Sequence, residues 1–222
     1  MVLISGSGTN LQAIIESINS GKVPAQINAV VSNVRDAYGL KRAAQAGIET
    51  QVLEHSAFAT REDYDRALVD CIERYVPNLV VLAGFMRILG PQFVKRYPHQ
   101  IINIHPSLLP KYRGLHTHER ALRDGASIHG ATVHFVTEAL DDGPIIIQGA
   151  VAVHSNDTVD ALQRRVQHEE HRIYPLAIRW FAQGQLSIHE GRVLLDGRTR
   201  SAQGLVAAHL NSPTVNPTLS ID

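Results

Sequence analysis

The chain has 222 residues, 44% of them hydrophobic, and this length is sufficient to bury the core of one α/β domain. Lysine plus arginine and aspartate plus glutamate both total 21, which places the pI near 7.2. This balance provides no positive field to attract nucleic acid or an anionic membrane, so we expect small-molecule partners, with no nucleic acid and no membrane.

Short apolar runs alternate with amphipathic runs over the first hundred residues. The apolar runs are 2–5, 27–32, 50–53, 78–84 and 100–104, and helical patterns cover 10–18, 39–47, 61–75 and 91–97. Near-continuous strands of Val, Ile and Leu separated by helices are typical of a parallel sheet covered on both faces. The pattern predicts a doubly wound, Rossmann-like α/β fold with a mostly parallel sheet.

Two further apolar runs, 130–136 and 144–153, lie too close together for a crossover helix, so they predict an antiparallel C-terminal portion of the same sheet. Residues 1–199 are expected to form a single domain. Residues 200–222 show no sustained period and contain two prolines, which predicts a loosely packed or disordered tail.

The segment 158–180 has helical spacing, and its apolar stripe is interrupted by one carboxylate. The apolar positions step by three, four and seven residues, and between Val166 and Ile173 the stripe carries Glu170. A carboxylate on the inward face of a helix is costly unless something pairs with it. Glu170 is therefore a candidate binding residue.

The run SGSGTNLQ, residues 5–12, follows the first strand and opens a helix, where free backbone N–H groups favour an anion such as phosphate. It lacks the third glycine of the dinucleotide fingerprint, because position 11 is Leu, and no Gly-Lys-Ser/Thr of a P-loop follows. A second interpretation of this run is a tight turn in which Thr9 or Asn10 caps the helix.

Twelve histidines raise the question of a metal site. His116 and His118 are two positions apart and do not share a helix face. His168 and His171 form HEEH, not the H-E-x-x-H pattern that places two ligands one turn apart with the glutamate between them, and no third ligand is evident. We interpret them as surface or core histidines and expect no metal. The single cysteine, Cys71, lies in a helical run and is expected to be a buried, small apolar side chain.

No segment approaches the ~18 apolar residues of a membrane span, and the N-terminus lacks the features of a signal peptide. We expect a cytoplasmic protein that is a monomer or a homodimer.

Asn103 and His105 occupy alternate positions at the end of the fifth predicted strand, so both side chains point to one face where the strand ends. The segment GFMRILG, 84–90, leaves the preceding strand at the same edge and is either core or an apolar ligand wall. The run LDDGP, 140–144, is by itself explained as a turn.

Several long motifs together resemble the glycinamide ribonucleotide (phosphoribosylglycinamide) formyltransferases of purine biosynthesis. The motifs are VVLAGFMRIL at 80–89, NIHPSLLPKYRGLHTHERAL at 103–122 and ATVHFVTEALDDGPII at 131–146, and the resemblance extends from Val2 to about Leu195. It implies the formyltransferase fold and direct transfer of a formyl group from the co-substrate 10-formyltetrahydrofolate to the amine of N1-(5-phosphoribosyl)glycinamide, in de novo synthesis of IMP.

The resemblance also implies residue roles. Asn103, His105 and Asp141 correspond to the catalytic residues. The ribonucleotide would bind Gly8, Thr9, Asn10, Gln167 and Glu170. The folate would bind Arg61, Met86, Arg87, Ile88, Leu89, Asn103, Thr137, Glu138, Ala139, Leu140 and Asp141.

Chemically, these residue types suit acyl transfer to an amine. The Asn103 amide can donate to the oxyanion of a tetrahedral intermediate. His105 can also donate and can move protons, while Asp141 would favour the imidazolium by charge pairing and fix the orientation of the ring. Neither a metal nor a covalent enzyme intermediate is needed.

Two positions depart from the pattern of these enzymes. Arg113 replaces a frequent proline, and Asp142 replaces a frequent glycine. The run KYRG is nearer to methionyl-tRNA formyltransferase, but the short tail and zero net charge do not supply its RNA-binding domain. A formyltetrahydrofolate hydrolase is a further related class. A non-catalytic nucleotide-binding α/β module would explain the glycine loop but not Asn103, His105 and Asp141.

Overall fold

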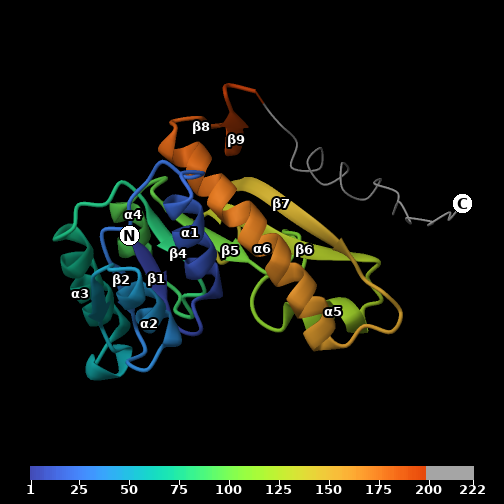
Figure 1. Ribbon diagram of the computed structural model, residues 1–222, viewed down its shortest axis with the longest axis horizontal. Coiled ribbons are helices and arrows are strands. Elements are labelled where there is room, and N and C mark those ends of the chain that lie inside the picture. The colour runs from blue at the N-terminus through green and yellow to red at the C-terminus, as the bar shows by residue number, and fades with distance from the viewer. Residues whose placement is uncertain (199–222) are drawn as a thin grey trace, which may run out of the picture.

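The computed structural model describes residues 1–198, in which a seven-stranded sheet carries helices on both faces and a small two-stranded hairpin follows (Figure 1). The strands are β1 (Val2–Ile4), β2 (Val30–Ser32), β3 (Thr50–Val52), β4 (Val80–Leu82), β5 (Ile101–His105), β6 (Ile128–Phe135), β7 (Ile145–Ala152), β8 (Leu186–His189) and β9 (Arg192–Leu195). The sheet order is β3-β2-β1-β4-β5-β6-β7, with β8 and β9 pairing separately.

The first five strands are parallel, whereas β6 runs antiparallel to β5 and β7 antiparallel to β6. The prediction of a doubly wound, mostly parallel sheet with an antiparallel C-terminal portion is therefore confirmed. The chain order reverses between β1 and β4, and ligands of open α/β sheets bind outside the carboxyl ends of the strands at such a point.

Helices cover both faces of the sheet (Figure 1). They are α1 (Thr9–Asn19), α2 (Tyr38–Gln45), the 3₁₀ turn η1 (His55–Ala57), α3 (Arg61–Glu73), α4 (Pro91–Arg96), α5 (Thr117–Arg123) and α6 (Val159–Ala182). One face packs against α1, α2 and α6, and the other packs against α3 and α4. The long helix predicted at 158–180 corresponds to α6.

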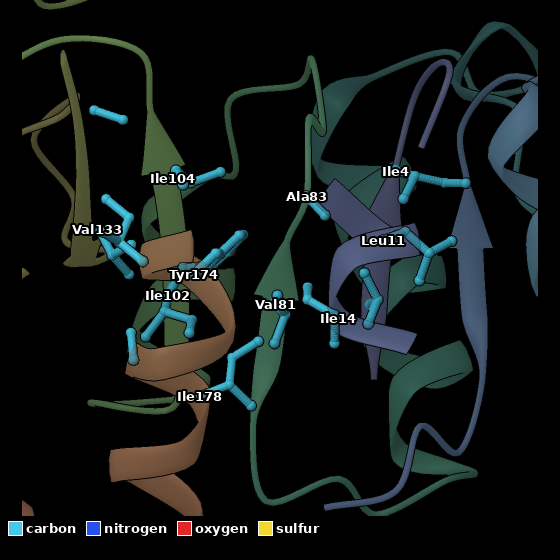
Figure 2. Packing of buried hydrophobic residues seen from close by; sticks show 14 of the residues in the cluster. Ile4, Leu11, Ile14, Val81, Ala83, Ile102, Ile104, Val133, Tyr174 and Ile178 are labelled. Atoms are coloured by element: carbon cyan, nitrogen blue, oxygen red, sulfur yellow. The ribbon is translucent and has the colours of Figure 1, made fainter. Parts of the chain in front are cut away.

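Alternation within the strands divides the core into two layers. In β1, Val2 and Ile4 belong to the layer under α1 and α6, whereas Leu3 belongs to the layer under α3. Figure 2 shows the first layer, in which side chains of the central strands meet Leu11 of α1 and Tyr174 of α6. Because both faces are covered, the strands read as continuous apolar runs.

Cys71 is buried in α3, as expected. Among the features that escaped prediction are the short helix α5 and the hairpin of β8 and β9. Both are short and carry exposed positions, so neither leaves a strong periodic signal in the sequence. The predicted tail at 200–222 lies outside the described residues. None of the helices within 1–198 combines the length and the apolar character required to cross a membrane.

Candidate active site

A cavity of about 630 Å³ lies at the carboxyl ends of β4 and β5, next to the reversal of chain order. Thirteen of the residues predicted from the sequence line it: Asn10, Met86, Arg87, Ile88, Leu89, Asn103, His105, Thr137, Glu138, Ala139, Leu140, Asp141 and Glu170. Gly8, Thr9, Arg61 and Gln167 are outside this lining. The fold thus brings together residues that are up to 160 positions apart in the chain.

Asn103 is oriented by a histidine that the sequence did not single out. The register of β5 and β6 places Asn103 opposite His134, and Nδ2 of Asn103 lies 3.2 Å from Nε2 of His134. Nδ1 of His134 donates to the carbonyl of Phe135, so Nε2 of the neutral ring accepts from the amide. Burial lowers the pKa of His134 and so favours this neutral form. The second amide hydrogen of Asn103 is not used in this contact with His134.

His105 makes two contacts through its ring nitrogens. Nε2 donates to the carbonyl oxygen of Tyr112 at 2.9 Å, and Nδ1 faces Oδ2 of Asp141 at 3.4 Å. A neutral ring that uses its single proton on Nε2 would present a lone pair to the carboxylate, whereas the imidazolium presents an N–H. In this arrangement a charged ring can donate to both the Tyr112 carbonyl and the Asp141 carboxylate.

Asp141 is held by the backbone of a neighbouring loop. The N–H of Gly114 donates to Oδ2 of Asp141 at 2.9 Å, and the residue has a left-handed φ of 49°. Aspartate tolerates this conformation better than most side chains. The turn 140–144, which the sequence explains as turn chemistry, thus also aims a carboxylate at His105. The adjacent Asp142 pairs with Arg113, so the two departures noted in the sequence contact each other.

Two further histidines form a pair beside the cavity. Nδ1 of His118 lies 3.1 Å from Nε2 of His129, and His129 is fully buried. Burial, followed by the proximity of His118, lowers the pKa of His129 to about 4. Burial also lowers the pKa of His118, so both rings are neutral at pH 7. Within residues 1–198, no group of three or more metal-binding side chains is present.

The start of α1 is joined to α6 by two side-chain hydrogen bonds. Nδ2 of Asn10 donates to Oε2 of Glu170 at 2.8 Å, and Nε2 of Gln167 donates to Oγ1 of Thr9 at 3.0 Å. Burial raises the pKa of Glu170 to about 7, although the bond from Asn10 opposes this. Oδ1 of Asn10 is buried without a hydrogen-bond partner in the described part of the chain. Asn10 and Glu170 form a polar corner of the cavity.

The N-cap of α1 is Gly8, so the interpretation in which Thr9 or Asn10 caps the helix is wrong. Gly8 has a φ of 70°, and a Cβ there would lie 2.6 Å from Cα of Gly39. The close approach of α2 therefore requires glycine at this turn. With no capping side chain, the first N–H groups of α1 are available to an anion.

The wall segment, residues 84–90, has no regular secondary structure, and residues 84–89 of it line the cavity. Met86 and Ile88 expose 68% and 59% of their surfaces on its rim, where Leu115 and Leu140 are also exposed. A cluster of exposed apolar side chains around a cavity marks a binding surface. Arg61 of α3 reaches this segment from outside and donates to the carbonyl of Ile88.

Sequence reasoning missed His134, and also the backbone groups of Tyr112 and Gly114. The alternation in GATVHFV places Thr132 and His134 on one face, but only strand register puts that face beside Asn103. The backbone contacts cannot be predicted from residue type, because nearly every residue has a backbone N–H that can donate and a carbonyl that can accept.

Comparison with known proteins identifies the family of this chain. The sequence profile of the formyl transferase family matches residues 1–178. Phosphoribosylglycinamide formyltransferase of Escherichia coli K12 is 55% identical over 207 residues, which are 93% of this chain and 98% of that protein.

Two solved structures are also similar to this chain. The glycinamide ribonucleotide transformylase 1 of Symbiobacterium toebii is 48% identical, with a TM-score of 0.86 over 87% of this chain and 92% of that one. The phosphoribosylglycinamide formyltransferase of Coxiella burnetii, solved in complex with CHES, is 53% identical, with a TM-score of 0.85 over 89% and 92%. The chain therefore belongs to the formyl transferase family.

Proposed function

We propose that this protein transfers the formyl group of 10-formyltetrahydrofolate to the amine of N1-(5-phosphoribosyl)glycinamide, giving the N2-formyl product and tetrahydrofolate in de novo purine biosynthesis. The observation that carries the proposal is the convergence of Asn103, His105 and Asp141 on one cavity. The similarity to phosphoribosylglycinamide formyltransferases over most of the chain supports the same substrates.

In the reaction, the amine nitrogen attacks the formyl carbon and forms a tetrahedral intermediate with an oxyanion. Asn103 donates the amide hydrogen that His134 does not use. The positive charge of His105, which Asp141 stabilises, lowers the energy of the developing negative charge. The carbon–nitrogen bond to the folate then breaks, so the attacking nitrogen loses one proton and the leaving nitrogen gains one.

His105 is the proton carrier in this scheme. Its Nε2–H donates a hydrogen bond to the carbonyl of Tyr112. This hydrogen bond must break, and the Nε2–H must turn to a reacting group, before the proton can be transferred. The contact with Asp141 keeps the ring in place during the exchange. Formyl transfer by this route uses side chains alone.

The two substrates occupy different sides of the cavity. The phosphate binds at Gly8, Thr9 and Asn10, where the start of α1 has no capping side chain and offers backbone N–H donors. Gln167 and Glu170 bind the remainder of the ribonucleotide. The folate lies against the wall segment and the loop 137–141, whose apolar rim suits its ring system.

The test is an assay of the purified protein with 10-formyltetrahydrofolate and three acceptors. We expect rapid formation of tetrahydrofolate with glycinamide ribonucleotide and little with methionyl-tRNA or with water alone. Transfer to methionyl-tRNA would indicate a tRNA formyltransferase, and acceptor-independent release of formate would indicate a hydrolase. If no acceptor supported turnover, the proposal would be wrong.

A further inference from the structure

The wall segment, 84–90, is irregular backbone and therefore needs contacts from outside to keep one shape. Two of its backbone N–H groups are bound by side chains from other elements. The N–H of Met86 donates to Oγ of Ser5 at 2.7 Å, and the N–H of Gly90 donates to Oδ2 of Asp65 at 2.7 Å. The segment is thus anchored near its first and its last residue.

The anchor at Gly90 is a buried carboxylate that the proposed reaction does not use. Asp65 lies on the inner face of α3 and is 8% exposed, so it is costly there unless it is hydrogen-bonded. A Cβ on Gly90 would lie 2.5 Å from Oδ2 of Asp65. The absence of a side chain at Gly90 therefore lets the carboxylate reach the backbone.

Other residues of α3 contact the wall segment beside this anchor. Arg61, one turn before Asp65, donates to the carbonyl of Ile88, and the guanidinium of Arg87 lies over the ring of Tyr64 at 5.3 Å. Burial raises the pKa of Asp65, and the N–H of Gly90, Arg61 and Arg87 oppose this rise. One face of α3 is thus fitted to the outer side of the segment.

The anchor at Met86 connects the segment to the first two strands. Ser5, which follows β1, donates to Oδ1 of Asn33 at 2.5 Å and accepts from the N–H of Met86. Asn33 follows β2 and is buried. The hydroxyl of Ser5 thus both donates and accepts a hydrogen bond, which fixes its orientation.

We infer that Asp65 is a positioning residue for the folate side of the active site, acting through Gly90 to hold the wall segment in the shape that binds the co-substrate, with Ser5 as the second anchor. The inference rests on the proposed function, because it assigns the wall segment to the folate. It predicts that loss of Asp65 raises KM for the folate and leaves KM for the ribonucleotide nearly unchanged.

The experiment compares Asp65→Ala with wild type in formyl transfer, varying each substrate in turn. Loss of a hydrogen bond to a charged group is equivalent to a change of ~10-fold to 100-fold, so we expect KM for 10-formyltetrahydrofolate to rise about 10-fold or more. KM for glycinamide ribonucleotide should change less than about twofold, since the residues proposed for it are held by α1 and α6. Asp65→Asn keeps an accepting oxygen and should recover much of the loss.

Asp63→Ala is the matched control. Asp63 lies on the same helix and takes part in its N-terminal cap with Thr60, at the exposed end of α3. This variant should lower the melting temperature without separating the two KM values. Amide hydrogen exchange should accelerate across residues 84–90 in Asp65→Ala and remain as in wild type in Asp63→Ala.

Ser5→Ala removes the acceptor of the other anchor, and it supplies the test if Asp65→Ala does not fold. It should raise KM for the folate selectively in the same way. If the wild-type protein is active but neither KM changes in the variants, or both KM values change equally, the positioning role is refuted. Absence of formyl transfer by wild type would instead refute the proposed function, and this inference with it.

Discussion

Nδ1 of His105 lies 3.4 Å from Oδ2 of Asp141, and this contact joins the end of β5 to the turn between β6 and β7. The side chains are 8% and 9% exposed, so water does little to screen the pair. Since Nε2 of His105 already donates to Tyr112, only the imidazolium can also donate to Asp141. The two residues therefore act as one unit in our proposal.

Asp141→Asn should show this coupling. The substitution keeps the shape of the side chain but removes its charge, and we expect kcat to fall by ~10²–10³. In the double variant with His105→Ala, kcat should be hardly lower than in His105→Ala alone, because the function of Asp141 depends on the ring. Additive losses in this cycle would indicate that the two residues act independently.

Asn103→Ala tests the proposed oxyanion donor. An interaction that is stronger in the transition state than with bound substrates lowers kcat when it is lost, and leaves both substrate affinities nearly intact. Loss of one such donor costs ~10²–10³ in kcat, or about 3 to 4 kcal/mol. Steady-state kinetics and a melting curve on the same sample provide the measurement. A destabilised variant with near-normal turnover per folded molecule would assign Asn103 to structure.

Glu170→Ala should act on the ribonucleotide. We expect KM for this substrate to rise by ~10-fold or more, while KM for the folate changes little, because the carboxylate lies in the polar corner with Asn10. Glu169→Ala is the neighbouring control, since that side chain pairs with Arg172 instead. Equal effects of Glu170→Ala on both substrates would remove Glu170 from the acceptor site.

Glu170 also predicts a pH dependence of stability. Burial raises its pKa from 4.5 to about 7 in the folded protein, so between these pH values the folded state binds more protons than the unfolded state. The free energy of unfolding should therefore fall as pH rises from 4.5 to 7. The contribution is on the order of 3 kcal/mol, and it should be missing in Glu170→Gln. Denaturant unfolding of both proteins at several pH values measures the difference.

If the stability difference between wild type and Glu170→Gln did not change over this pH interval, the carboxylate would titrate normally in the folded state. Comparing the two proteins isolates Glu170, because the buried histidines are present in both.

Arg113 and Asp142 form an ion pair between the loop after β5 and the turn after β6. Their side chains are 41% and 47% exposed, so we expect a coupling of only ~0.2–1 kcal/mol in a double-mutant cycle of unfolding free energies. The coupling should vanish at ~1 M salt, where charges are screened within about 3 Å. A coupling that persisted at high salt would indicate a contact of another kind.

The sequence by itself determined the sheet and the main candidate catalytic positions. Continuous Val, Ile and Leu runs predict parallel strands because burial on both faces removes polar alternation. The two-residue repeat of a strand places Asn103 and His105 of the run INIH on one face. Glu170 interrupts the apolar stripe of its helix, which identifies it as a polar residue on the inward face. These features are local, so a linear pattern records them.

Tertiary structure alone decided which groups orient the predicted side chains. His134 reaches Asn103 through the register of two antiparallel strands, and Asp65 reaches Gly90 through the packing of α3. Gly114 and Tyr112 act through backbone atoms, which every residue type possesses. Such contacts depend on the distance between segments far apart in the chain, and this distance is set only when the helices pack on the sheet.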